Sequence, residues 1–273
     1  MTDTHHRGIG VNVQLLGCIE LRTDHGNRVS ASPAVRALLA ALASSPNTFV
    51  SDENVIDRIW QDAAPAHPLN ALYTLVTRLR KALRVLGTGE EAGEVIRRQG
   101  GYVLVIDTAA VDACRFRALV RQAREAVSRE EDVQALRLYE EALSLWHGDP
   151  LSGIRTGWAD GVRVTLRHEW RAVVLNSAEA GLRLNRHDDY LPQLHELARE
   201  YSLDERVAGL LMLALYRSGR QDEALRCFHR IRSELVDRLG DEPGRDLRDL
   251  HERILRRDDG IRTGRPAPHA LAS

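Results

Sequence analysis

The spacing of apolar residues along this chain of 273 residues changes near residue 107, and that change limits the folds it can adopt. Before residue 107, short segments with an apolar residue at every second position are typical of half-buried β-strands. After it, apolar residues recur three and four positions apart as far as residue 257, which is typical of amphipathic α-helices. The sequence therefore predicts a mixed fold, with an α+β domain over residues 1–107 and an all-α domain over residues 108–258. Residues 259–273 are rich in glycine and proline, and we expect a disordered tail there.

Within residues 1–107 the expected strands enclose three expected helices. Strands are predicted over residues 11–16, 19–23, 94–98 and 102–106. Helices are predicted over residues 33–43, 52–61 and 68–86. Ser32 and Ser51 directly precede the first two helices, where a serine hydroxyl caps free N–H groups, and Pro33 and Pro68 suit a first helical turn. The order is strands, three helices, then a hairpin.

Small and aromatic residues recur in the second half at an offset of 34 positions. The pairs with this offset are Ala178 and Met212, Tyr190 and Ala224, Leu194 and Phe228, and Leu197 and Ile231. An earlier segment has the same internal spacing at Ala123, Ala135, Tyr139 and Ala142. Three helix–turn–helix units of this length predict a tetratricopeptide-like helical repeat. An ordinary antiparallel helical bundle is the alternative.

The composition restricts the class of protein. With 43% hydrophobic and 28% charged residues, the chain has the make-up of a globular protein. Its cysteines, Cys18, Cys114 and Cys227, are far apart, so neither a disulfide framework nor a zinc ribbon is indicated. The longest uncharged apolar stretch, residues 207–216, is much shorter than the ~20 residues that cross a bilayer. We therefore expect a cytoplasmic protein that makes no membrane contact.

The helix expected over residues 68–86 concentrates positive charge. No acidic residue occurs between residues 63 and 89, although residues 1–107 hold eleven basic and eleven acidic residues in total. At 100° per residue, the apolar face of this helix carries Leu72, Val76, Leu79, Leu83 and Leu86. The opposite face carries Asn70, Tyr73, Thr74, Thr77, Arg78, Lys81 and Arg84. A DNA major groove accepts such a helix, because Asn can pair with adenine and Arg or Lys with guanine. The alternative is a solvated basic face.

The turn between the last two expected strands is also basic. Arg97, Arg98 and Gln99 lie beside Gly100 and Gly101, which permit a tight turn. Cations at a hairpin tip can contact phosphates or the minor groove. We therefore predict a wing beside the basic helix.

Short motifs accompany these features in both halves of the chain. The first half contains Ile59-Trp60, Asn70-Ala71-Leu72, Val76-Thr77-Arg78-Leu79-Arg80-Lys81-Ala82-Leu83 and Gly100-Gly101-Tyr102. The second half contains Ala-Leu-Ser-Leu-Trp-His-Gly-Asp-Pro-Leu at residues 142–151, Ala-Leu-Tyr-Arg-Ser-Gly-Arg-Gln-Asp-Glu-Ala-Leu at 214–225 and Leu-Gly-Asp-Glu-Pro-Gly at 239–244. With these motifs, residues 11–258 resemble the Streptomyces antibiotic regulatory protein family. Its members join an OmpR/PhoB-type winged helix-turn-helix to a bacterial transcriptional activator domain.

The resemblance implies a transcriptional activator of a biosynthetic gene cluster for a secondary metabolite. It implies that two protomers bind direct repeats in double-stranded promoter DNA near the −35 element, as a homodimer, and help to recruit RNA polymerase holoenzyme. It places residues 70–84 in the major groove, residues 97–99 near the minor groove, and Ser51 and Trp60 close to phosphates. At His67, Pro68 and Leu69 the sequence departs from the family, whose members commonly carry arginine or small polar residues there.

Enzyme motifs are missing from the sequence. It has no G-x-x-x-x-G-K-S/T nucleotide loop, no G-x-S-x-G elbow and no paired-histidine metal motif. The glycine-rich residues 87–93 follow a helix and include two glutamates, so we expect a loop. We therefore expect no catalytic site, metal or cofactor, and no small-molecule effector is identified. Trp146, Trp158 and Trp170 are expected in the core, with a ligand groove as the alternative. The rival interpretation of the whole chain is a helical-repeat scaffold that binds no DNA.

Overall fold

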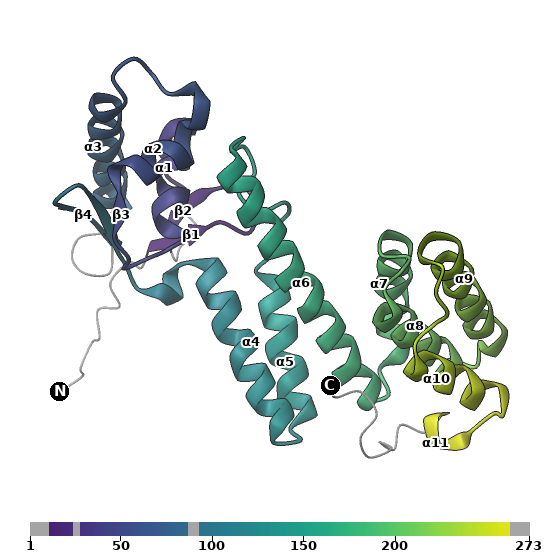
Figure 1. Cartoon of the computed structure of the whole chain (residues 1–273). Helices are drawn as coiled ribbons and strands as arrows, with labels where there is room; N and C mark the ends of the chain where they lie inside the picture. The colour runs from purple at the N-terminus through teal and green to yellow at the C-terminus, as the bar shows by residue number, and fades with distance from the viewer. Residues whose placement is uncertain (1–10, 24–27, 87–92, 263–273) are drawn as a thin grey trace, which may run out of the picture. The chain divides into compact units, whose positions relative to one another are not determined.

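A computed structural model describes residues 11–23, 28–86 and 93–262, and the chain divides into two compact units. The first unit consists of Met1–Arg121 with Glu141–Arg171, and the second of Gln122–Glu140 with Ala172–Ser273. Among the described residues, all named strands lie in the first unit, whereas the second is helical (Figure 1). This confirms the predicted mixed fold, with an α+β winged-helix part followed by an all-α part.

A small antiparallel sheet opens the first unit. β1 (Val11–Gln14) pairs with β2 (Glu20–Thr23), and Val13 lies opposite Leu21. α1 (Pro33–Ala43) follows, and the Ser32 hydroxyl caps it by accepting a hydrogen bond from the N–H of Val35. Nearly all side chains of α1 are buried, so this helix lies in the core of the winged-helix part.

A second sheet forms the hairpin predicted as a wing. Its strands lie in the spatial order β3 (Val50–Ser51), β5 (Gly101–Val105) and β4 (Glu94–Arg98). Gly100 has a φ of +77°, in the left-handed region that favours glycine. Gly101 leaves no room for a side chain, because a Cβ there would lie 2.3 Å from the carbonyl oxygen of Val50. Both glycines are therefore needed, one for the turn and one for the close approach of β3.

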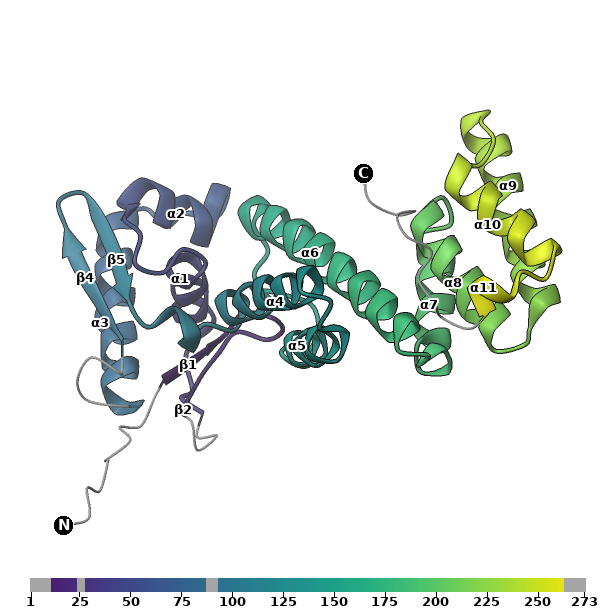
Figure 2. The ribbon, with the colours of Figure 1, turned by 90° about the horizontal axis from the view of Figure 1, so that it is seen from below.

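The helix-turn-helix lies between β3 and β4 in sequence. α2 (Asp52–Trp60) ends one residue before its predicted end, because Gln61 adopts a φ of +49° and begins the short 3-10 helix η1 (Gln61–Ala63). α3 (Pro68–Leu86) has the predicted bounds. The three helices contact one another, and α3 also contacts β4, so the hairpin lies beside α3 (Figures 1 and 2). Residues 87–92 of the predicted glycine-rich loop lie outside the described residues.

The first strand is also tied to residues beyond the expected domain boundary. The short η3 (Thr108–Ala110) leads into α4 (Asp112–Ser128). The carboxylate of Asp112 accepts hydrogen bonds from the N–H groups of Leu15 (2.8 Å) and Leu16 (2.9 Å). The N–H of Leu151 donates to the carbonyl of Leu15 (2.9 Å). Residue 107 therefore lies inside the first compact unit, and the division into domains 1–107 and 108–258 stays a prediction.

The second unit contains stacked helices. Described helices with residues in this unit include the end of α4, α5 (Asp132–Ser144), the larger part of α6 (Gly157–Arg183), α7 (His187–Glu200), α8 (Glu205–Arg217), α9 (Gln221–Leu239) and α10 (Arg245–Leu255). All eight residues of the 34-residue pairs are buried, at 0 to 7% exposure. Gly181 lets the ring of Tyr190 approach α6, since a Cβ there would lie 2.2 Å from that ring. Small residues thus let aromatic side chains fill the space between helices, as the repeat predicted.

The end of the described chain corrects the expected tail. Asp259–Arg262 forms α11, which contacts α8. The side chain of Ile261 is only 7% exposed, and Arg217 Nε donates to the carbonyl of Ile261 at 2.8 Å. A disordered tail therefore does not begin at residue 259, because one isoleucine supplies enough apolar surface to dock this turn. Residues 263–273 lie outside the described residues. No described helix is both long and apolar enough to cross a bilayer.

Candidate nucleic-acid interface

The apolar face of α3 is buried against the winged-helix core. Leu72, Val76, Leu79 and Leu83 are each at most 2% exposed, while the side chain of Leu86 lies outside those described. Five helical turns with one buried stripe fix the rotation of α3 about its axis. The opposite side of the helix must then face outward.

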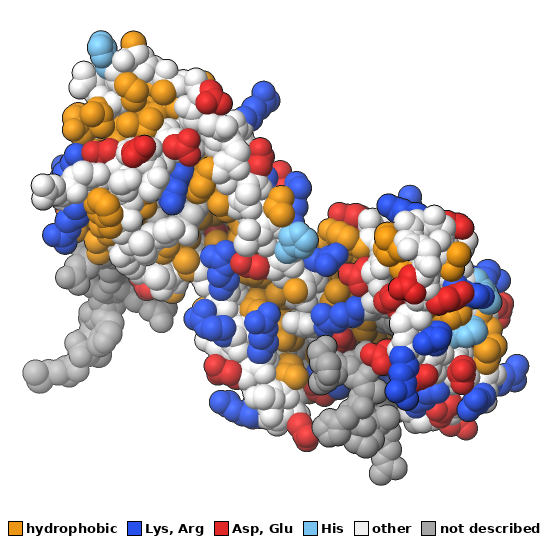
Figure 3. Space-filling view, viewed as in Figure 1, with side chains coloured by type: hydrophobic (Ala, Val, Ile, Leu, Met, Phe, Trp, Pro, Cys, Tyr) orange, Lys and Arg blue, Asp and Glu red, His pale blue; other side chains and the backbone are white. Residues whose placement is uncertain are grey.

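The structure places the predicted polar residues of α3 on that side. We call this surface the outward face of α3; its residues, all exposed, are Asn70, Tyr73, Thr74, Thr77, Arg78, Lys81 and Arg84. No acidic side chain belongs to α3. Lys and Arg side chains border the edge formed by α3 and the β4–β5 hairpin in the space-filling view (Figure 3). The outward face thus offers amide, hydroxyl and cationic groups together.

The two threonines of this face use their hydroxyl protons within the helix. Thr74 Oγ1 donates to the carbonyl of Asn70 (3.0 Å), and Thr77 Oγ1 donates to the carbonyl of Tyr73 (2.9 Å). Each threonine therefore presents an acceptor oxygen and a methyl group to its surroundings. A methyl group can contact the methyl of thymine, and an acceptor can pair with an exocyclic amine.

Arg80 differs from its exposed neighbours on α3, because its side chain forms a hydrogen bond within the protein. Its Nε donates to the carbonyl of Val95 on β4 at 2.8 Å, and the residue is half-buried. This bond fixes the hairpin against α3. Sequence reasoning did not identify this role, since a basic residue inside a basic run gives no sign that it bonds to a strand 15 residues later.

Arg97, predicted at the hairpin tip, is on β4 and is bound by the protein. Its guanidinium forms two hydrogen bonds with the Asp52 carboxylate, and Nη2–Oδ2 is 2.8 Å. It also lies over the rings of Tyr102 (4.6 Å to the centroid) and Tyr73 (5.5 Å). The hydrogen bonds to Asp52 raise the pKa of Arg97 above its ordinary value. Asp52 was missed by the sequence analysis, and its charge near α3 is offset by this pair.

The remaining residues predicted to contact DNA lie at the hairpin turn and at the two ends of α2. Arg98 and Gln99 are exposed at the hairpin turn. Ser51 is half-buried, and its hydroxyl oxygen caps α2 by accepting from the N–H of Asn54 (3.2 Å), which leaves its proton free to donate. Trp60 is half-buried at the end of α2. Thus α3 and the turn form a continuous candidate surface, whereas Ser51 and Trp60 lie at the two ends of α2.

Across residues 11–23, 28–86 and 93–262, no three His, Cys, Asp or Glu side chains gather in an arrangement that could hold a metal ion.

Two family models match consecutive parts of the chain. Residues 26–104 match the family described as "Transcriptional regulatory protein, C terminal". Residues 111–255 match the family described as "Bacterial transcriptional activator domain". The first contains the described helix-turn-helix and hairpin, and the second spans more than half of the chain.

Whole-chain comparisons agree with these matches. The regulatory protein DnrI of Streptomyces peucetius is 35% identical over 257 residues, which cover 91% of this chain and 94% of DnrI. The transcriptional regulator RedD of Streptomyces coelicolor is 34% identical over 250 residues, which cover 91% of this chain and 71% of RedD. The solved structure of Mycobacterium tuberculosis EmbR, in complex with a low affinity phosphopeptide, matches with a TM-score of 0.84 at 28% identity, covering 93% of this chain and 69% of EmbR. The chain belongs to the Streptomyces antibiotic regulatory protein family of transcriptional activators.

Proposed function

We propose that this protein binds direct repeats near the −35 element as a dimer and recruits RNA polymerase holoenzyme, which switches on a biosynthetic gene cluster. The observation that carries the proposal is the outward face of α3, an exposed polar surface without acidic groups beside a basic hairpin turn. Membership of a family of antibiotic-pathway regulators supports the activator role. A regulator of this kind acts on DNA in the cytoplasm, at the nucleoid.

The chemistry of each side chain suggests its partner on DNA. We assign Asn70, Thr74, Thr77 and Lys81 to base edges, because amides pair with adenine, methyl groups contact thymine, and cations pair with guanine. Hydrogen-bond donors nearer the margins of the surface suit phosphates, which position the protein without reading sequence. In that second group we place Ser51, Trp60, Tyr73, Arg78, Arg84, Arg98 and Gln99. Arg97 contributes to DNA binding only indirectly, because it holds the hairpin of β4 and β5 in place.

Salt-dependent binding to promoter fragments tests the assignment. DNA fragments from upstream of neighbouring genes are titrated with the full chain at several salt concentrations, with fluorescence anisotropy as the readout. Replacing Lys81 by alanine is expected to weaken binding to the preferred fragment by about 1 to 3 kcal/mol and to reduce discrimination among fragments. A matched control is Arg256→Ala, which removes an exposed arginine directly after the C-terminal end of α10 in the second unit. Equal affinity for all fragments at every salt concentration would favour the scaffold interpretation.

Dimerisation on DNA and polymerase recruitment need a separate experiment. A footprint with purified protein is expected to protect two repeats in the same orientation, and scrambling either repeat is expected to weaken protection of the other. Adding RNA polymerase holoenzyme should then extend the footprint over the core promoter. Independent protection of single repeats contradicts the dimer, and an unchanged footprint with polymerase contradicts recruitment.

A further inference from the structure

A cavity of about 550 Å³ lies within the first compact unit. Its walls come from the C-terminal end of α1, the first turns of α4, the first turns of α6 and residues of the preceding loop. Pockets that bind small organic molecules typically enclose about 300 to 1,000 Å³. The size of the cavity therefore fits a small organic ligand, and Trp158, expected in the core, lies in its wall.

The cavity exists because small residues line it where helices would otherwise pack. Ala43 and Ser44 end α1, Ala113 lies on α4, and Gly157 and Gly161 lie on one side of α6. Gly161 is exposed and a Cβ built on it meets no atom within 4 Å, so the pocket opens to solvent at this glycine. The space between these small residues leaves room for a molecule that is not part of the chain.

The lining is apolar over most of its area and carries one cation. Leu151, Leu166 and the ring of Trp158 supply apolar surface. Burial raises the pKa of the Cys114 thiol, which keeps it neutral. Arg117 is the one cation among the lining residues. Its Nε and Nη2 donate to Glu169, whereas its Nη1 makes no hydrogen bond within the part of the chain that the structure describes.

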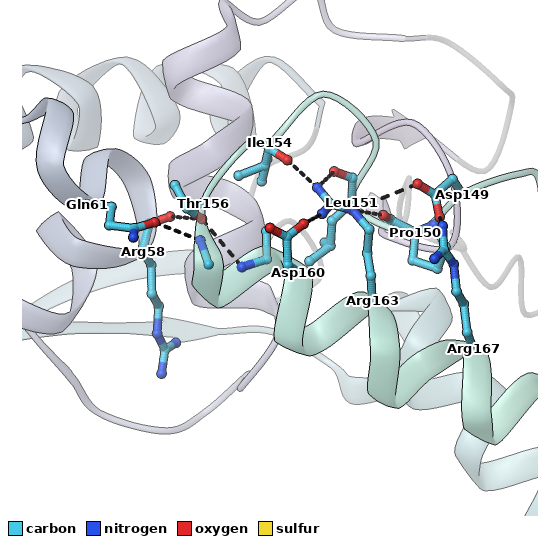
Figure 4. A network of polar contacts seen from close by, with 12 residues as sticks. Arg58, Gln61, Asp149, Pro150, Leu151, Ile154, Thr156, Asp160, Arg163 and Arg167 are labelled. Atoms are coloured by element: carbon cyan, nitrogen blue, oxygen red, sulfur yellow. Dashed lines mark hydrogen bonds and ion pairs between the residues drawn. The ribbon is translucent and has the colours of Figure 1, made fainter.

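A polar network fixes the wall that carries Trp158 (Figure 4). The N–H of Gly157 donates to Gln61 Oε1 (2.7 Å), and Thr156 Oγ1 donates to the carbonyl of Arg58 (3.1 Å). The guanidinium of Arg58 lies 5.3 Å from the ring centroid of Trp158.

The neighbouring loop is held in the same network. Arg163 donates to the carbonyls of Pro150 (3.0 Å), Leu151 and Ile154, and pairs with Asp160 (Figure 4). Because this wall is already held at several points, little conformational entropy is lost when a ligand binds, which favours affinity.

We propose that this cavity binds a small organic anion: a ring-containing, mostly apolar molecule that packs against Trp158 and pairs one carboxylate or sulfonate with Arg117. The apolar walls account for the body of the ligand, and the Nη1 of Arg117 offers a hydrogen-bond donor to its acidic group, beside the pair that Nε and Nη2 form with Glu169. Gln61 and Arg58 belong to the segment that precedes α3, so the ligand would lie next to the bonds that hold this segment.

Binding of 8-anilinonaphthalene-1-sulfonate to the folded full chain tests the site. This probe has fused rings and one sulfonate, and its fluorescence rises in apolar surroundings. We expect saturable binding of one molecule per chain. Thr165→Trp, which places a large ring in the cavity wall, should weaken binding at least tenfold. Val164→Trp is the matched control, because Val164 is the adjacent residue of α6, is 53% exposed and does not line the cavity; it should bind within twofold of the wild type.

Two further variants keep the test decisive. Gly161→Leu fills the same cavity while improving helix propensity, so it gives the answer if Thr165→Trp does not fold. The double variant Arg117→Met/Glu169→Gln removes the cation without stranding its partner, and it should abolish the preference for the sulfonate over uncharged N-phenyl-1-naphthylamine. Unchanged probe binding in the folded cavity-filling variants overturns the site, and an unchanged preference in the double variant overturns the role of Arg117. These measurements contain no DNA, so they are independent of the proposed function.

Discussion

Arg97 on β4 and Asp52 at the first turn of α2 form a two-point ion pair that joins the hairpin to the helix-turn-helix. The pair is covered on the arginine side by the ring of Tyr102. Asp52 is well placed at a helix N-terminus, where a negative charge is favourable. The same carboxylate would repel a DNA phosphate if it were unpaired. The ion pair therefore serves both the geometry and the electrostatics of the candidate interface.

Arg97 and Arg98 should have different effects when each is replaced by methionine. Arg97→Met should lower the free energy of unfolding by about 1 kcal/mol, because it removes a partly exposed ion pair and a stacking contact. It should also weaken DNA binding for all sequences, since the hairpin is no longer fixed and Asp52 is left unpaired. Denaturant unfolding and anisotropy titrations measure the two effects.

Arg98→Met is the matched control for that change. Arg98 is exposed and forms no ion pair with the described residues, so stability should be unchanged. If Arg98 contacts one phosphate, the slope of log affinity against log salt should fall by about one. Equal losses of stability in the two variants would disprove the positioning role of Arg97.

Arg78 and Arg80 provide a second contrast, two positions apart on α3. Arg78→Ala should weaken DNA binding and leave the unfolding free energy within about 0.5 kcal/mol, because an exposed arginine is removed. Arg80→Ala should lower the unfolding free energy by about 1 to 2 kcal/mol, because the carbonyl of Val95 loses its charged donor. Urea unfolding with both variants checks the prediction, and the reverse order of stabilities would refute it.

Asp112 should make stability depend on pH. Burial raises its pKa to about 6, from an ordinary value of 3.8, although hydrogen bonds from the N–H groups of Leu16, Leu15 and Ala113 oppose the rise. A carboxyl with a raised pKa binds its proton more tightly in the folded state. The stabilisation is fully present below about pH 4 and is lost as pH rises through about 6.

The prediction for Asp112 is checked by comparing the unfolding free energy of the wild type with that of the Asp112→Asn variant. The unfolding free energy of the wild type minus that of Asp112→Asn should fall by about 3 kcal/mol between pH 4 and pH 7. The asparagine is neutral throughout, so other titrating groups cancel in the difference. A difference that stays constant over this range would show that Asp112 does not titrate there.

Ile261 should contribute to the stability of the second unit. Truncation after Asp258 should lower the unfolding free energy by about 1 to 3 kcal/mol, because the buried Ile261 and its bond to Arg217 are lost. The single substitution Ile261→Ala should account for most of this loss. Thermal unfolding of the two variants is the test, and a truncated chain as stable as the wild type would show that α11 contributes nothing.

Local pattern was enough to predict α3 and its orientation. Five turns of leucine and valine at helical spacing define one buried face, and a helix with a buried face has a determined outward face. The hairpin was predictable for a similar reason, since Gly100 and Gly101 lie between two period-two segments. The buried pairs 34 residues apart were also visible in the sequence, because each repeat uses the same packing positions.

Contacts between distant residues could not be predicted in this way. The partner of Arg97 lies 45 positions away, and Leu15 and Asp112 are 97 positions apart. No periodic pattern connects such residues, so the sequence did not show that Arg97 pairs with Asp52 or that Asp112 bonds to Leu15 and Leu16. The docking of α11 depends on a single isoleucine in a short helix, which is too little for any pattern to indicate.

The bonds from Asp112 to the end of β1 have a consequence for changes in chain length. Residues 106–111 connect β5 to the side chain of Asp112, which must reach Leu15 and Leu16, so they act as a spacer of fixed length. Extra residues inserted there would pull the carboxylate out of register and free two amide groups at the strand end. The join between the two halves of this chain is thus among the places least tolerant of added length.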